Sequence, residues 1–398
     1  MKKVLIGLFL LIILVNSSNT QGKLATPKVN LEDLSESSLT LSYPEVEGED
    51  NLHTLNRIDL VDPHISYGKD VRGVYVSAWA ASNRRRITTI LDEVEESNLN
   101  AIVIDLKDTD GIITFKEQEG RSGTLIRDFK DIVDQAHRRG IYVIARLAVF
   151  NDNIFAENNP DHALEYLSAK DNETIIRSEK WTSPYSKEVW DYNLEIAKRA
   201  ADLGVDEIKF DYIRFPTLAR NSTLIIKEEG YSKSEIIIEF LKYANQELEE
   251  YNVIKSADVF GLTTTIPGDL NIGQDITKLA HYVDYLSPMI YPSHYDSGMY
   301  GVNDPDANPY PIIYRSLRDA KRKLGDDSYK LRPWLQNFSL RHRYGEEEVL
   351  DQIRAVEDQG INGWLLWNPR SVYDFSFFKE EGESVEWSLQ GSELFLKR

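Results

Sequence analysis

From about residue 71 onward, the chain is built from short apolar runs that alternate with longer amphipathic segments. The apolar runs have the length and composition of buried strands, and they cover residues 73–79, 101–106, 142–149, 207–213, 256–262, 285–291, 332–338 and 363–367. The amphipathic segments have helical periodicity, and they cover residues 85–97, 129–139, 187–203, 233–250, 276–281, 313–324 and 346–359. Strands separated by crossovers of helical length predict an α/β fold in which a parallel sheet closes on itself, a (β/α)8 or TIM barrel.

Local signals support the predicted helices and the closed barrel. Glycine follows several of the predicted helices, at Gly140, Gly204 and Gly360, where it suits the left-handed conformation that ends a helix. The rival architecture is a doubly wound open sheet, which normally carries a Gly-rich phosphate-binding turn after its first strand. Residues 76–80 read Val-Ser-Ala-Trp-Ala and contain no glycine.

The N-terminal region has the pattern of a secretory signal. The chain begins Met-Lys-Lys, residues 4–15 are apolar, and small polar residues follow. The apolar run is shorter than the roughly 20 residues of a spanning helix, so we expect a signal peptide over residues 1–20, with a permanent anchor as the alternative. Residues 21–67 are rich in Ser and acidic residues, which predicts a flexible acidic spacer before a barrel domain over residues 68–398. We therefore expect a protein that is secreted or held at the extracytoplasmic cell surface, with membrane contact only if the N-terminal segment stays uncleaved.

The composition excludes several classes of protein. Asp and Glu number 65 against 46 Lys and Arg, which gives a net charge of −19. Nucleic-acid-binding proteins need a basic surface, so no nucleic acid is expected as a partner. The chain has no cysteine, which excludes disulfides, thiolate metal sites and cysteine nucleophiles. Its 7 histidines include no His-x-x-x-His spacing, so we expect neither a catalytic zinc site nor another metal or cofactor.

Ionisable residues interrupt four neighbouring strands of the predicted barrel. Alternation with a period of two turns every second side chain of a strand into the barrel, and it assigns the following residues to the interior: Asp105, Lys107, Arg146, Lys209, Asp211 and Asp258. Buried charges must pair with one another or with a ligand. Because barrel enzymes carry their chemistry at the C-terminal ends of the strands, one interpretation is a site at the barrel mouth. The other is a buried ion network that fills the barrel bottom, formed by the first five of these residues.

The carboxyl groups suit the cleavage of a glycosidic bond, which needs one protonated and one ionised carboxyl. Asp211 follows the cation Lys209 by two residues on the same face of its strand, so we assign it the ionised role of nucleophile or base. Asp258 lies in an otherwise apolar strand, and we assign it the role of proton donor because apolar surroundings raise the pKa of a carboxyl. Asp105 is a third catalytic candidate, which would orient Arg146 or bind a sugar hydroxyl.

Cations and aromatic rings at the strand ends are suited to binding a saccharide, because aromatic rings stack on the apolar faces of sugars while their polar atoms meet hydroxyls. The predicted substrate-binding residues are Trp79, Lys107, Arg146, Lys209, Arg214, Tyr291, His294 and Trp367. Ordinary packing is the alternative for any of these rings, and we favour packing for Trp334 and Trp364. His294 also has a side chain that can act as a general acid–base near neutral pH.

Several strand motifs resemble those of one family of barrels. They are VRGVYVS at residues 71–77, NAIVIDLKD at 100–108, DYIRFP at 211–216, SADVFG at 256–261, SPMIYPSHY at 287–295 and GWLLWNP at 363–369. These motifs look like those of the glycoside-hydrolase-like TIM-barrel family DUF4015, and the resemblance extends from about residue 71 to the C-terminal region. It implies a carbohydrate-active barrel, often on exported bacterial proteins, and hence a bacterial origin. In related barrels the aspartate of the fourth strand commonly acts as the nucleophile, a role that the resemblance assigns to Asp211.

These observations predict an exported glycoside hydrolase that cleaves an envelope or extracellular polysaccharide with a pair of carboxylates. The alternative is a barrel that binds carbohydrate at the cell surface without cleaving it. The separation of the two carboxyl groups distinguishes these functions, because hydrolysis requires about 5–9.5 Å between them.

Overall fold

The structure is a computed structural model that describes residues 70–115, 125–226, 230–379, 387–390 and 393–396. The signal peptide predicted over residues 1–20 and the spacer predicted over residues 21–67 lie outside the described residues.

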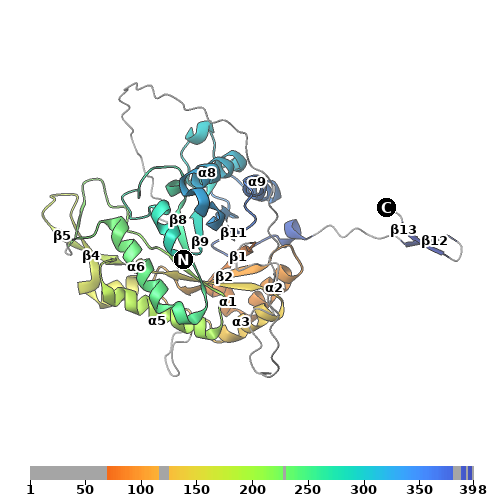
Figure 1. The fold of residues 1–398 in the computed structure, drawn as a ribbon, viewed down its shortest axis with the longest axis horizontal. Coiled ribbons are helices and arrows are strands. Elements are labelled where there is room, and N and C mark those ends of the chain that lie inside the picture. Colours follow the sequence, from red (N-terminus) through yellow and green to blue (C-terminus); the bar gives the residue numbers. More distant parts are fainter. Residues whose placement is uncertain (1–69, 116–124, 227–229, 380–386, 391–392, 397–398) are drawn as a thin grey trace, which may run out of the picture. The chain divides into compact units, whose positions relative to one another are not determined.

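Parallel strands close into a barrel, which Figure 1 shows from one side. In order around the barrel the strands are β1 (Arg72–Val76), β11 (Trp364–Trp367), β10 (Trp334–Gln336), β9 (Tyr285–Met289), β8 (Ile254–Phe260), β6 (Glu207–Asp211), β3 (Tyr142–Ala148) and β2 (Ala101–Lys107). The circle closes where β2 pairs with β1, in a register that places Gly73 opposite Ala101. The predicted (β/α)8 barrel is confirmed, and each predicted strand overlaps an observed one.

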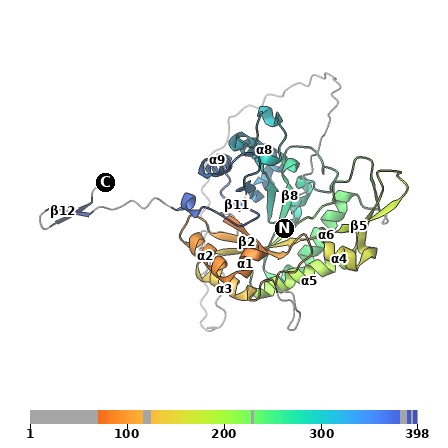
Figure 2. The same ribbon diagram turned by 180° about the vertical axis from the view of Figure 1, so that it is seen from behind.

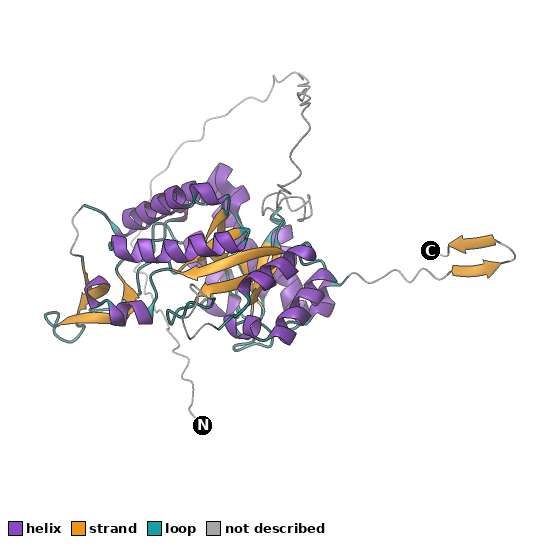
Figure 3. Ribbon diagram, turned by 90° about the horizontal axis from the view of Figure 1, so that it is seen from below, coloured by secondary structure: helices purple, strands orange, loops and turns teal. Residues whose placement is uncertain are grey.

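Helices surround the barrel, as the views from behind and from below show (Figures 2 and 3). They are α1 (Ala78–Ser82), α2 (Arg84–Glu95), α3 (Phe129–Arg138), α4 (Asn153–Asn158), α5 (Lys187–Leu203), α6 (Lys233–Glu247), α7 (Ile276–Leu279), α8 (Pro309–Leu324) and α9 (Glu346–Glu357). Local sequence sets their ends. In α5 the Ser186 side chain accepts from the Val189 N–H, and Gly204 ends the helix with a φ of 101°.

The two faces of each barrel strand are buried in different surroundings. On β2, Ile102 and Ile104 point outward into the layer between sheet and helices, while Val103 points into the barrel with Tyr75 and Trp334. The outer layer forms the larger apolar cluster, and burial of each such side chain contributes about 1.5–3 kcal/mol relative to exposure. The barrel interior can therefore contain polar residues, because the layer between sheet and helices supplies most of the hydrophobic stabilisation.

An insertion that the sequence did not predict extends from the barrel and is formed by two loops, one between β3 and α5 and the other between β6 and α6. It contains α4 and a small antiparallel sheet in the order β5 (Ile175–Thr182), β4 (Ala163–Leu167) and β7 (Thr223–Ile225). Figure 3 shows this sheet on the left, beside the barrel. The rings of Trp181 on β5 and Tyr212 after β6 lie 5.9 Å apart, so the insertion reaches the C-terminal end of the barrel.

Near the C-terminus, β12 (Trp387–Gln390) and β13 (Glu393–Leu396) form an antiparallel hairpin. None of the helices within the described residues has the length and apolar character that crossing a membrane requires.

Candidate active site

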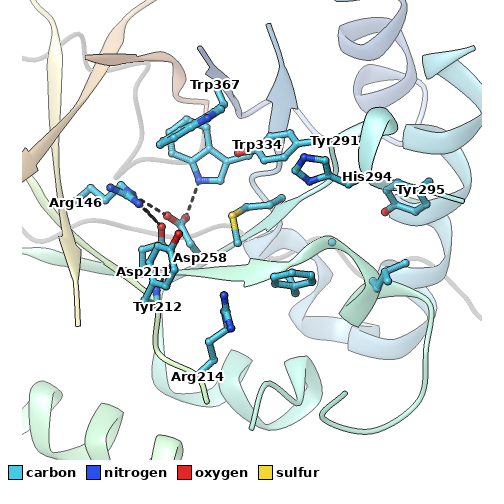
Figure 4. Close-up of a pocket in the computed structure, with 14 residues that line it drawn as sticks. Arg146, Asp211, Tyr212, Arg214, Asp258, Tyr291, His294, Tyr295, Trp334 and Trp367 are labelled. Atoms are coloured by element: carbon cyan, nitrogen blue, oxygen red, sulfur yellow. Dashed lines mark hydrogen bonds and ion pairs between the residues drawn. The ribbon is translucent and has the colours of Figure 1, made fainter. Parts of the chain in front are cut away.

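A cavity of about 250 Å³ lies at the C-terminal ends of the barrel strands (Figure 4). Its lining includes Arg146, Asp211, Tyr212, Arg214, Asp258, Phe260, Met289, Tyr291, His294, Tyr295, Trp334 and Trp367. Asp211 and Asp258 are buried, whereas Phe260 is 39% exposed and His294 is exposed. The carboxylates therefore lie at the floor of the cavity, and the more exposed residues lie nearer its rim.

One guanidinium group connects the carboxylates of three strands. Arg146 on β3 donates from Nε and Nη2 to Asp211 Oδ2, at 2.9 and 2.6 Å, and from Nη1 to Asp105 Oδ1 at 2.6 Å. The Asp258 Oδ2 atom lies 3.9 Å from Arg146 Nε. Such close pairing compensates the cost of burying these charges. Burial lowers the pKa of Arg146, but Asp211 and Asp105 more than reverse this effect and raise it well above the usual value.

Asp258 has a different environment from Asp211. Its Oδ1 accepts a hydrogen bond from Trp334 Nε1 at 2.7 Å and lies 3.4 Å from Lys209 Nζ. Burial raises the pKa of Asp258 to about 6, and the charge of Asp211 adds to this rise, while Lys209, Arg146 and Trp334 oppose it. Asp258 therefore carries a proton in a substantial fraction of molecules at mildly acidic pH.

The backbone after β6 is strained where it forms the floor of the cavity. Tyr212 has a φ of 54°, in the left-handed region, which costs a non-glycine residue about 1–3 kcal/mol. Its N–H donates to Asp211 Oδ1 at 2.6 Å. Both oxygens of Asp211 are thus hydrogen-bonded, and the strained turn and Arg146 together hold the carboxylate in one orientation.

Most of the predicted site residues meet in the cavity. The sequence-predicted residues that line it are Arg146, Asp211, Arg214, Asp258, Tyr291, His294 and Trp367. Asp105 lies behind Arg146, where it also accepts a hydrogen bond from the Tyr75 hydroxyl at 2.5 Å, and it is not part of the cavity lining. The buried-network interpretation is therefore correct for Asp105, which balances the charge of Arg146 from below the cavity.

Lys209 also lies outside the cavity lining, so the prediction that it binds substrate is wrong. It is fully buried in the barrel, where Nζ donates to Ser287 Oγ at 2.7 Å and lies 3.8 Å from Glu207 Oε1. Glu207 in turn pairs with Arg332. These residues fill the interior beneath Asp258, and Lys209 acts on the site through that carboxylate.

Lys107 points away from the barrel interior, which corrects the prediction from strand alternation. The register between β2 and β3 shifts between Asp105 and Lys107, so Lys107 pairs with Leu147, an outward-facing residue. Its Nζ lies 2.6 Å from Asp152 Oδ2 and 2.8 Å from Asn193 Oδ1 on α5. Lys107 is therefore a fully buried structural cation between the sheet and the helix layer.

Trp79 is also absent from the cavity, because β1 ends earlier than the apolar run suggested. The chain leaves β1 after Val76, and the Ser77 side chain caps α1 by accepting from the Ala80 N–H. Trp79 therefore lies on α1 and is 69% exposed. The structure does not place Trp79 in the cavity lining, and its role in sugar binding stays a prediction.

Sequence reasoning missed several residues of the lining, above all Trp334, which it assigned to packing. Trp334 begins β10 and forms the floor next to Asp258, and its ring meets that of Trp367 edge-on at 5.4 Å. An available signal was that an indole N–H buried in a barrel requires an acceptor. Within the described residues, no cluster of three or more His, Asp or Glu side chains suitable for a metal ion is present.

A family model described as a "putative glycosyl hydrolase domain" (DUF4015) matches residues 73–373, which include all of the barrel strands except the first residue of β1. The chain belongs to this family. The resemblance inferred from the strand motifs is confirmed, and with it the prediction of a glycoside hydrolase.

Among solved structures, the chain is similar to the PgaB (BpsB) glycoside hydrolase domain from Bordetella bronchiseptica, with a TM-score of 0.57, 15% identity and coverage of 76% of this chain and 94% of that one. At 15% identity, this similarity shows a shared fold and nothing more. A hypothetical protein from Ruminiclostridium thermocellum ATCC 27405 is 32% identical over 47% of this chain and 97% of that chain, with a TM-score of 0.40. A comparison with curated proteins finds no match.

Proposed function

We propose that this protein is an exported glycoside hydrolase that cleaves a polysaccharide of the cell envelope or surroundings with Asp211 and Asp258. The observation that carries the proposal is the pair of carboxyl groups at the cavity floor, of which Asp258 has a pKa raised to about 6 while Asp211 is paired with Arg146. Family membership supports the reaction class. The positively charged and apolar N-terminal segment supports export.

The spacing of the two carboxyl groups is compatible with glycosidic cleavage. Oδ2 of Asp211 and Oδ2 of Asp258 lie 2.9 and 3.9 Å from the same Arg146 nitrogen. These two oxygens are therefore no more than about 7 Å apart, a range that includes the separation used by retaining enzymes and the shortest separations of inverting enzymes. A binding site without catalysis needs no such pair.

The proposed roles follow from the environments. Asp258 donates its proton to the leaving oxygen, because its raised pKa keeps a protonated fraction available. Asp211, which accepts two hydrogen bonds from Arg146, attacks the anomeric carbon or activates water. Trp367, whose ring stacks on that of Tyr75 at 4.0 Å, and Tyr291 provide fixed aromatic surfaces for the sugar rings.

The test is turnover by the purified protein on a panel of microbial polysaccharides, read by the release of reducing ends. Asp211→Asn and Asp258→Asn should each lower kcat by about a hundredfold to ten-thousandfold on the polysaccharide that the wild type cleaves. Asp326→Asn changes an exposed aspartate and serves as the control. Thermal unfolding of each variant shows whether the fold is retained.

Aryl glycosides of the same sugar separate the two roles. A nitrophenolate leaves without protonation, so Asp258→Asn should keep most of its activity on the aryl glycoside while Asp211→Asn loses it. Wild-type rates in a folded Asp211→Asn variant would remove Asp211 from the mechanism. Saccharide binding without cleavage anywhere in the panel would instead indicate a carbohydrate-binding barrel.

A further inference from the structure

Arg214 is a second cation in the cavity wall, and aromatic rings hold it in place. Its Cζ atom lies 4.8 Å from the ring centroid of Trp181, 5.3 Å from that of Tyr212 and 5.2 Å from that of Phe260. Trp181 belongs to β5 of the inserted sheet. These three contacts, from three different segments of the chain, fix the planar guanidinium in position.

The charge of Arg214 is far less compensated than that of Arg146. Across the residues that the structure describes, no carboxylate forms an ion pair with Arg214, and its one hydrogen bond runs from Nη1 to the Phe215 carbonyl at 3.0 Å. A guanidinium carries five N–H donors. Asp211 acts on Arg214 only from a longer distance, and it already accepts two hydrogen bonds from Arg146. Burial lowers the pKa of Arg214, which reflects this lack of compensation.

The position of Arg214 makes its free donors accessible to a ligand. It is partly exposed and lines the cavity. Figure 4 shows its guanidinium end directed into the cavity, on the side of the two aspartates opposite Trp367. A saccharide bound over Asp211 and Asp258 would therefore meet Trp367 on one side and an unpaired cation on the other.

We propose that Arg214 binds an anionic substituent, a carboxylate or a phosphate, of the saccharide in this cavity, so that the substrate is an acidic polysaccharide. The inference rests on the proposed function for the presence of a saccharide. The guanidinium fork matches both kinds of anion through paired hydrogen bonds. The net charge of −19 repels such a polymer at long range, so binding depends on this local contact.

The experiment compares sugars with and without an anionic substituent. Binding of N-acetylmuramate against N-acetylglucosamine and of glucuronate against glucose tests a carboxylate, while glucose 6-phosphate against glucose tests a phosphate. Tryptophan fluorescence reports binding, because Trp181, Trp334 and Trp367 lie at or beside the cavity. The anionic member of at least one pair should bind about tenfold more tightly to the wild type, as expected for a charged hydrogen bond.

Variants assign the preference to Arg214. Arg214→Gln should abolish the difference within the pair, and Arg214→Lys should retain part of it. Arg220→Gln, at an exposed position on the same loop, should behave like the wild type. Equal binding or no binding by both members of every pair, or a preference that survives in a folded Arg214→Gln variant, would overturn the proposal.

The assay involves no turnover, so the two proposals fail separately. An active enzyme without a preference for anionic sugars removes only the role of Arg214. A protein that prefers anionic sugars through Arg214 but cleaves no polysaccharide removes only the proposed hydrolysis.

Discussion

Replacing Trp334 with phenylalanine removes one hydrogen bond from Asp258 and tests whether this carboxyl is the proton donor. The indole Nε1 donates to Asp258 Oδ1 at 2.7 Å, and both side chains are buried. The hydrogen bond favours the ionised carboxylate, so it opposes the rise that burial causes in the pKa of Asp258. Without it, the pKa of Asp258 should lie above the present value of about 6.

The size of the effect follows from the strength of the lost contact. A hydrogen bond to a charged group contributes about 1.5–3 kcal/mol, and about 1.4 kcal/mol corresponds to a tenfold change in a proton-binding equilibrium. The titration midpoint of Asp258 should therefore rise by about one to two pH units. Phenylalanine fills much of the space of the indole, so we expect the fold to survive this change.

Two measurements report the titration midpoint of Asp258. Carbon-13 NMR of labelled aspartate carboxyls reports the titration of Asp258 directly. The pH dependence of kcat/KM, measured on the polysaccharide found by screening, reports the proton donor of the free enzyme. Because the acid must be protonated, wild-type activity should fall as the pH rises above about 6, and the Trp334→Phe variant should keep its activity to higher pH.

Trp364→Phe is the matched control. Trp364 is also buried on the barrel, but its indole nitrogen meets no acceptor in the described part of the chain. A midpoint that stays the same or falls in Trp334→Phe, or one that rises equally in Trp364→Phe, would refute the reasoning about Asp258.

Three further variants test stability. The pKa of Asp258 is raised from 3.8 to about 6 in the folded protein, so protonation of Asp258 favours the folded state. This contribution to the free energy of unfolding is about 3 kcal/mol below about pH 4, and it is lost as the pH rises to about 6 and above. Urea titrations should therefore show that Asp258→Asn becomes more stable relative to the wild type as the pH rises from about 4 to about 6. A difference in unfolding free energy that stays constant over this pH range would contradict the raised pKa of Asp258. Lys107→Met leaves Asp152 buried without its ion pair and should lower the free energy of unfolding by about 3–5 kcal/mol without changing sugar binding. Trp79→Ala, at an exposed position, should change the free energy of unfolding by no more than about 0.5 kcal/mol. If a Lys107→Met variant of normal stability lost sugar affinity, Lys107 would have to be counted among the substrate-binding residues.

The barrel could be predicted because its signals are local. Alternation along the strands assigned Arg146 and Asp211 to the barrel interior, where they pair, and glycine marked the end of α5. The inserted sheet gave no such signal. Its strands pair residues as distant as Glu165 and Ile225, and most of β5 is exposed, so no apolar alternation marks it.

Part of the site was predictable for the same reason. The C-terminal ends of parallel strands meet at one end of a barrel, and this rule alone brought Arg146, Asp211 and Asp258 together. It failed at Lys107, because a one-residue shift in pairing reverses the face of a strand and depends on the partner strand. It also failed at Trp79, where a cap at Ser77 ended the strand early.

The amino-acid sequence by itself determined the order of strands and helices, the closed barrel and the strands that supply the carboxyl groups, because periodicity and end signals act over a few neighbouring residues. Only the tertiary structure decided which charges neutralise one another. Arg146 is paired with Asp105 and Asp211, whereas Arg214 is held by aromatic rings and keeps unused donors. Electrostatic compensation depends on distances of a few ångströms between residues far apart in the chain, and no local pattern contains those distances.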